Sequence, residues 1–291
     1  MTRLVLNADD FGLAPAHARR IAALRAKGLL TDTSLLSNGV SFEAAAADLR
    51  RAGLSGTGVH LCLTGGEAPV CAPREIPSLL AGAVFRPHWL HVLAALAAGR
   101  IRPSEVEREW EAQIARAAGA GLTITHLDSH QNLHLHPLLF PVAVALARRF
   151  EVPFVRAPRS DDPPVRPDAP LGARLRAGLL AGLGGRGRRL LERAGLPEPP
   201  RVLGLAEAGH MTAARFRQAV ADLPEGDYEI VLHSGDEDDV TRARYHWGYA
   251  WREESDALES GAIASALAER GIAAVSFGAL ASGDHRRSEP E

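Results

Sequence analysis

The chain is organised around the stretch Thr125-His126-Leu127-Asp128-Ser129-His130-Gln131-Asn132-Leu133-His134-Leu135-His136, which holds four of the twelve histidines. Apolar residues lead into this stretch from Leu122, so we expect a strand that runs out into a polar end. Imidazole is costly to bury unpaired and is a common metal ligand, so the cluster indicates a metal or acid–base site. Surface histidines in a loop are an equally good interpretation here, because only His126, Asp128 and His130 can share one face of a strand.

Composition narrows the class of protein. The 291 residues are 46% hydrophobic, which is ample for the core of one large α/β domain or two ordinary ones. The net charge is −2 with scattered basic residues, so we expect no nucleic-acid partner. The first apolar run is too short for a signal peptide and no run reaches roughly 18 residues, so we expect a cytoplasmic protein without a transmembrane segment. Cys62 and Cys71 are expected to be free thiols.

Strand and helix patterns alternate along the chain. Apolar runs predict strands at about 3–9, 31–37, 57–64, 122–130, 152–157, 202–205, 228–233 and 274–277. Helical spacing between them predicts helices at about 15–27, 41–52, 88–98, 103–118, 137–149, 172–193, 211–223 and 255–270, the sixth interrupted by the glycines of 182–187. The α/β alternation predicts a distorted (β/α) barrel, similar to a TIM barrel, with seven to eight parallel strands. We expect a single domain over 1–281 and a disordered polar tail over 282–291.

Three segments have open interpretations. Residues 65–87 lack clear periodicity and are longer than a normal connection, as substrate loops or lids often are. The basic segment 172–193 is typical of a solvated face, and peripheral contact with a membrane is the alternative. The aromatic segment 245–251 either stacks on sugar rings or packs against the barrel rim.

Polar residues end five of the predicted strands. They are Asp9 and Asp10 on the first strand, His60 on the third, His130 on the fourth, Arg156 on the fifth and His233 on the seventh. In a barrel the carboxyl ends of the strands form one rim, and packing alone does not require titratable groups there. Their convergence favours a catalytic site over a core or surface role.

The same residues carry a resemblance to a known family. The motifs Asn7-Ala8-Asp9-Asp10-Phe11-Gly12, Gly58-Val59-His60-Leu61 and 125–131, with the later Arg156 and His233, are similar to those of the YdjC-like carbohydrate deacetylase family. The resemblance runs from residue 3 to about residue 280. It implies a distorted barrel that removes N-acetyl groups from amino sugars. Segments 202–212 and 223–230 resemble the branch associated with hopanoid biosynthesis.

The resemblance also implies residue roles. It places the metal ligands on Asp10, His60 and His130, the general base on Asp9 and the acid on His233. One carboxylate and two imidazoles suit a single divalent ion, Zn²⁺ or Mg²⁺. Arg156 is expected to orient Asp9 or hold a substrate oxygen. Supporting or substrate-binding roles are expected for the neighbouring polar residues His126, Asp128, His134 and Asn7. Asn132 and Ser234 depart from the family pattern, where relatives often have histidine and proline.

The expected function is metal-dependent deacetylation of an N-acetylglucosamine-type amino sugar, on an oligosaccharide such as diacetylchitobiose or on a hopanoid-linked glycolipid. A metal-independent glycosidase using Asp9 and Asp128 is a second enzyme hypothesis. A non-catalytic sugar- or glycolipid-binding protein is the hypothesis from another class. Assembly as a homodimer is open.

Overall fold

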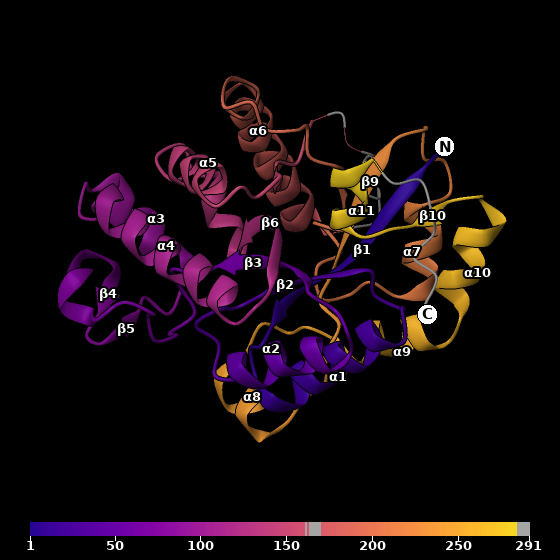
Figure 1. The fold of residues 1–291 in the computed structure, drawn as a ribbon, viewed down its shortest axis with the longest axis horizontal. Helices are drawn as coiled ribbons and strands as arrows, with labels where there is room; N and C mark the ends of the chain where they lie inside the picture. Colours follow the sequence, from indigo (N-terminus) through magenta and orange to yellow (C-terminus); the bar gives the residue numbers. More distant parts are fainter. Residues whose placement is uncertain (161, 163–169, 284–291) are drawn as a thin grey trace.

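The computed structural model describes residues 1–160, 162 and 170–283. Its main sheet is curled into a half-barrel, with helices around the outside (Figure 1). The strands of this sheet are β1 (Arg3–Phe11), β2 (Asp32–Leu35), β3 (Gly56–Leu61), β6 (Thr123–Ser129), β7 (Phe154–Val155), β8 (Arg201–Leu203), β9 (Asp227–Leu232) and β10 (Ala273–Ala274).

The strand order explains the curled shape. The sheet runs β7-β6-β3-β2-β1-β9-β8, and every pair along it is parallel. This is the cyclic order of a barrel that has been opened between β7 and β8, since those two strands share no backbone pairing within the described residues. The short β10 pairs with the start of β1 as an eighth strand. The predicted distorted barrel of seven to eight parallel strands is therefore confirmed.

Helices follow most of the strands and cover the outside of the sheet (Figure 1). They are α1 (Pro15–Ala26), α2 (Phe42–Arg51), α3 (Trp89–Ala97), α4 (Pro103–Gly119), α5 (Phe140–Arg149), α6 (Leu171–Arg193), α7 (Ala213–Ala219), α8 (Asp239–Arg244), α9 (Trp251–Glu259), α10 (Ala262–Glu269) and α11 (Phe277–Ser282). Helix α4 shows why they form where they do, because Val106, Trp110 and Ile114 recur at helical spacing and are fully buried.

Several predicted boundaries were wrong. Helix α6 continues through the glycines of 182–187 without interruption. The helix expected over 255–270 is two helices, because Gly261 takes the left-handed conformation (φ 75°) between α9 and α10. The last strand stops at Ala274, and Phe277 begins α11 instead. Of the predicted polar tail, 284–291 lies outside the described residues.

The long segment 65–87 is more ordered than its lack of periodicity indicated. It contains two short 3-10 helices, η1 (Pro73–Glu75) and η2 (Pro77–Leu79), and an antiparallel hairpin of β4 (Leu80–Ala81) and β5 (Val84–Phe85). Arg86 holds the hairpin to η2 by donating hydrogen bonds to the carbonyls of Ser78 and Leu80. The two ends of the segment are joined by backbone hydrogen bonds, from Gly65 N–H to the Arg86 carbonyl at 3.1 Å and from Phe85 N–H to the Glu67 carbonyl at 2.9 Å.

Candidate active site

A bulge at the end of β1 brings two adjacent carboxylates into one site. Successive residues of a regular strand point to opposite faces, which would separate Asp9 from Asp10. The pairing of β1 with β2 shifts register between Ala8 and Phe11, and Asp10 takes a left-handed backbone conformation (φ 60°). A non-glycine residue adopts this conformation rarely and at an energetic cost. The bulge therefore re-aims Asp10 and leaves both carboxylates buried among polar groups of the barrel interior.

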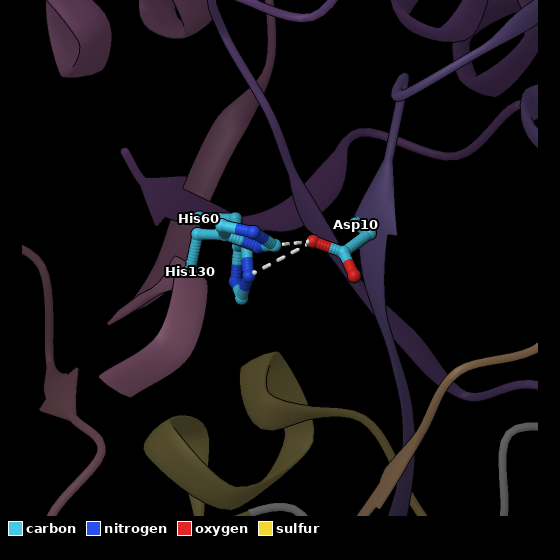
Figure 2. Close-up of side chains that lie close together, drawn as sticks. All are labelled: Asp10, His60 and His130. Atoms are coloured by element: carbon cyan, nitrogen blue, oxygen red, sulfur yellow. Dashed lines mark hydrogen bonds and ion pairs between the residues drawn. The ribbon is translucent and has the colours of Figure 1, made fainter. Parts of the chain in front are cut away.

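The rings of His60 and His130 converge on Asp10 (Figure 2). His130 Nδ1 lies 2.8 Å and His60 Nε2 lies 3.3 Å from the same oxygen, Asp10 Oδ1. All three residues are at most 5% exposed, and their donor atoms lie within 4.8 Å of one another. Burial alone would raise the pKa of Asp10, but the adjacent His130 and His60 lower it well below its usual value. Two imidazole nitrogens and a carboxylate oxygen at this spacing fit one divalent cation.

Asp128 sets the direction of the His60 ring. Its Oδ1 lies 2.9 Å from His60 Nδ1, which leaves Nε2 facing Asp10. Its other oxygen accepts a hydrogen bond from Ser34 Oγ at 2.8 Å. A carboxylate behind a histidine is the usual way in which a metal-binding imidazole is oriented. Asp128 therefore contacts the His60 ring on the side opposite Asp10.

Arg156 occupies the centre of a separate carboxylate cluster. Its Nη1 and Nη2 donate to the two oxygens of Asp9 at 2.8 Å each, and Nη2 also lies 2.6 Å from Asp128 Oδ2. Glu229 on β9 accepts from Nε at 3.1 Å. The described residues include two further groups that could hold a metal ion, Asp9–His60–Asp128 and His126–Asp128–Glu229. The carboxylates of both groups are already paired with the Arg156 guanidinium. A cation fits best at Asp10, His60 and His130.

Glu229 is a site residue that the sequence analysis missed. It is 1% exposed, and burial raises its pKa to about 7 although Arg156 opposes the rise. The available signal was an acidic residue inside the otherwise apolar run Tyr228–Leu232. A carboxylate in a buried strand requires a partner, and its partner is Arg156.

His233 follows β9 and faces the same interior. Its backbone N–H donates to Glu254 Oε2 at 2.6 Å, and its ring meets Tyr249 edge to face with centroids 4.8 Å apart. Ring atom Nδ1 has no hydrogen-bond partner among the described residues. Burial lowers the pKa of the imidazole. Glu254, which the sequence analysis also missed, holds the backbone at His233 in place.

Comparison with known proteins now places this chain in a family. Residues 3–269 match the model of a family described as YdjC-like protein. The chain belongs to the YdjC-like family.

Relatives of this YdjC-like protein include named enzymes. It is 38% identical over 157 residues to a carbohydrate deacetylase of Brevibacillus brevis, a match that covers 54% of this chain and 59% of that protein. It is 33% identical over 246 residues to a carbohydrate deacetylase of Mus musculus, covering 80% and 78% of the two chains. The chain thus spans less than two thirds of the length of the bacterial relative and more than two thirds of the mouse one.

A solved structure has the same overall fold. It is a crystal structure of a protein from Enterococcus faecalis V583 that is named for cellobiose-phosphate cleavage, with a TM-score of 0.77 and 25% identity. The match covers 96% of this YdjC-like protein and 98% of the other chain. The half-barrel therefore recurs over nearly the whole length of a distant relative.

The remaining predicted residues of the YdjC-like protein form hydrogen bonds around the candidate site. Asn7 donates to Asp9 Oδ1 at 2.9 Å and to Ser34 Oγ at 2.8 Å. His134 lies between Ser129 Oγ and the carbonyl of Arg156. His126 is fully buried, and its ring atom Nε2 lies 2.9 Å from Ser34 Oγ. Ser34, which the sequence analysis did not single out, joins three of these side chains.

Aromatic side chains cover the mouth of the site in this YdjC-like protein. Trp247 lies 4.9 Å from the ring of His130, and Tyr245 donates to the buried Glu67 at 2.6 Å. The segment 245–251 therefore packs directly on the candidate site and is tied to the start of 65–87. A hollow of about 20 Å³ at Asp9 and Asp10 adjoins a cavity of about 300 Å³. Both spaces are lined by the shared residues His130, Gln131, Arg176 and Tyr249.

Proposed function

We propose that this YdjC-like protein is a metal-dependent deacetylase that hydrolyses the N-acetyl group of an N-acetylglucosamine-type amino sugar. The observation that carries the proposal is the juxtaposition of two units. One is the cation-type donor set of Asp10, His60 and His130. The other is Asp9, the neighbour of Asp10 in the chain, which Arg156 holds in a single orientation. The relatives named carbohydrate deacetylase support the same activity.

The proposed roles follow from the donor set and its neighbours. A divalent ion held by Asp10, His60 and His130 would polarise the amide carbonyl and acidify a water molecule. Asp9 takes a proton from the attacking water while Arg156 keeps its carboxylate aimed. His233 donates a proton to the departing amine nitrogen as the C–N bond breaks. Burial lowers the pKa of His233, which makes its protonated form a stronger acid toward the departing amine.

The two spaces at the site suit this substrate. The hollow of about 20 Å³ beside the carboxylates has room for about one water molecule. The adjoining cavity of about 300 Å³ is at the small end of ligand pockets and is lined by Trp89, Trp247 and Tyr249. Aromatic faces of this kind stack on the apolar faces of sugar rings. The cavity therefore suits the sugar, and the hollow suits the attacking water molecule.

The acceptor of the sugar is a finer part of the proposal. Resemblance to the hopanoid-associated branch favours a glycolipid acceptor, and a chitooligosaccharide such as diacetylchitobiose is the alternative. The glycosidase hypothesis is disfavoured because Asp128 is fully buried and bonded to Arg156 and His60, out of reach of a substrate. A cytoplasmic location and a homodimer stay predictions from the sequence. Among the described residues, no helix has both the length and the apolarity to cross a bilayer.

The test is acetate release from N-acetylglucosamine, diacetylchitobiose and an N-acetylglucosaminyl lipid, with and without chelator and with added Zn²⁺ or Mg²⁺. We expect release that stops with chelator and returns with metal, and none from Asp9→Asn. The preferred acceptor separates the glycolipid from the oligosaccharide hypothesis. Sugar binding without acetate release from any substrate would favour the non-catalytic hypothesis. Release of free sugar despite chelator would favour the glycosidase.

A further inference from the structure

Helix α6 presents one face that the other described parts of the chain leave exposed. Its buried residues are Ala177, Leu180, Gly184 and Leu191, which lie on one side of the helix. The glycines hold this side close to the barrel, because a Cβ on Gly184 would collide with the Pro158 backbone and one on Gly187 with the Phe140 ring. The orientation of α6 about its own axis is therefore set by packing, and its opposite side faces outward.

Three leucines form a stripe on that outward side. Leu171, Leu175 and Leu179 are 68%, 65% and 63% exposed. Their spacing of four residues places them on successive turns of one helix face. A single exposed leucine is ordinary in a soluble protein, but a contiguous apolar stripe marks a surface that contacts something.

The same face becomes basic further along the helix. Arg186 and Arg189 continue the stripe in the next turns, are exposed, and form no hydrogen bond or ion pair within the described part of the chain. They line a hollow together with Arg159 and Arg188, which both pair with Glu198. Glu192 is the one acidic residue in the sequence of α6. The leucine–arginine face, defined as Leu171, Leu175, Leu179, Arg186 and Arg189, is thus apolar at one end and cationic at the other.

We propose that the leucine–arginine face docks on the surface of an anionic lipid bilayer. A helix that lies in the membrane interface places apolar side chains at the boundary between headgroups and acyl chains, while its arginines bind lipid phosphates. A second copy of this chain fits less well. Pairing α6 with α6 sets arginines against arginines or leucines against arginines, with no acidic stripe to complement them. Lipid phosphates supply the missing negative charge.

The position of this face relative to the candidate site gives the docking a consequence. Arg176, the residue after Leu175, lines both the catalytic hollow and the adjoining cavity. Helix α6 therefore carries the leucine–arginine face on its outward side. Arg176 of the same helix lines the cavity proposed for the substrate. Docking would hold the cavity close to the bilayer surface. The inference goes beyond the proposed deacetylase activity and does not depend on it, because lipid binding is measured without turnover.

The test is co-sedimentation of the full chain with vesicles of phosphatidylcholine alone or of phosphatidylcholine mixed with phosphatidylglycerol. We expect binding to the anionic vesicles that weakens as salt is raised. Leu171→Gln/Leu175→Gln/Leu179→Gln should reduce the partition coefficient about tenfold or more, through loss of the inserted side chains. Arg186→Glu/Arg189→Glu should reduce it by a similar factor, because two positive charges near the lipid surface become negative, a net change of about four units.

Matched controls separate this face from general surface effects. Val40→Gln changes another exposed apolar residue, and Arg19→Glu/Arg217→Glu changes net charge equally on α1 and α7. Both should bind like the wild type, and circular dichroism should show all variants folded. Equal binding of the wild type to neutral and anionic vesicles, or unchanged binding of the α6 variants, would overturn the proposal. So would a dimer in light scattering that the leucine variant breaks while vesicle binding is absent, because the face would then join two copies.

Discussion

Arg156 donates to both carboxylate oxygens of Asp9, from Nη1 to Oδ2 and from Nη2 to Oδ1, at 2.8 Å each. The two side chains are 2% and 3% exposed. A planar guanidinium paired with a planar carboxylate in this way allows one relative orientation, which a point charge would not impose. In the proposed reaction this pair decides where the general base points.

Replacing Arg156 by lysine keeps the charge and removes the fork. We expect Arg156→Lys to retain bound metal but to lose about 100-fold in kcat, because a small misplacement of a catalytic group costs that much. Acetate-release kinetics and metal analysis check this. Arg149→Lys is the control, since Arg149 makes forked contacts with Glu107 and Glu111 on the exposed surface. A kcat for Arg156→Lys equal to that of the control would show that the forked geometry is dispensable.

Adjacent aspartates should respond differently to substitution. Asp10→Ala removes the carboxylate on which His60 and His130 converge, so we expect loss of bound metal. Asp9→Asn leaves that donor set intact, so we expect metal to stay while turnover falls at least about 100-fold, as for loss of a general base. Metal content by mass spectrometry is compared with acetate release for both variants. Equal metal loss in both would overturn the assignment of ligand and base.

Glu229 should act through Arg156 rather than on the substrate. Glu229→Gln keeps the size of the side chain but offers one acceptor oxygen where the carboxylate offers two to Nε and Nη2. We expect kcat to fall about tenfold with KM and metal content unchanged. The substitution would disturb the position of Arg156 and, through it, only the orientation of the Asp9 carboxylate. Steady-state kinetics on the N-acetyl sugar separate the two parameters. A change confined to KM would instead indicate direct contact with substrate.

His233→Ala should slow reactions according to the leaving group. An amine leaves poorly without a proton, whereas the alcohol of an activated acetyl ester leaves well without one. We expect the variant to lose at least about 100-fold on the N-acetyl sugar and much less on the ester. Parallel assays of the two substrates measure the ratio. The same loss on both would refute the role of His233 as the acid.

The buried Glu254 should make stability depend on pH. Burial raises its pKa from 4.5 to about 7, so the folded state retains a proton that the unfolded state releases between these values. The free energy of unfolding should therefore fall as pH rises from about 4.5 to about 7, by on the order of 2–3 kcal/mol from this group. Urea unfolding at about pH 5 and about pH 8 should show a shallower fall for Glu254→Gln, which does not titrate. Parallel pH dependence in the two proteins would contradict the raised pKa.

Much of the architecture was readable from local sequence. Buried apolar runs alternate with helical patterns, and this alternation indicates parallel strands covered by helices. The polar residues at strand ends were grouped correctly for a simple reason. Parallel strands that start at one edge of a sheet all finish at the other, so Asp10, His60 and His130 meet although the chain separates them by up to 120 residues.

Other parts of the site required the folded chain. Glu229 reads as one polar residue in a strand, and its role appears only when Arg156 from a different strand lies beside it. The sequence around Glu254 predicts a charged residue on the exposed side of a helix. In the structure its carboxylate accepts hydrogen bonds from the backbone N–H groups of Met211 and His233. Such partners are non-local, and no periodicity within either segment encodes them.

By itself the sequence determined the α/β class, the strand ends that bear titratable side chains and the basic character of α6. Hydrophobic spacing and residue type are local properties, so they can be read without the fold. Tertiary structure alone decided the opening between β7 and β8, the bulge that turns Asp10 away from the direction of a regular strand, and the outward side of the leucines on α6. Each depends on which distant segment packs against which, because pairing register and helix rotation are set by contacts between elements.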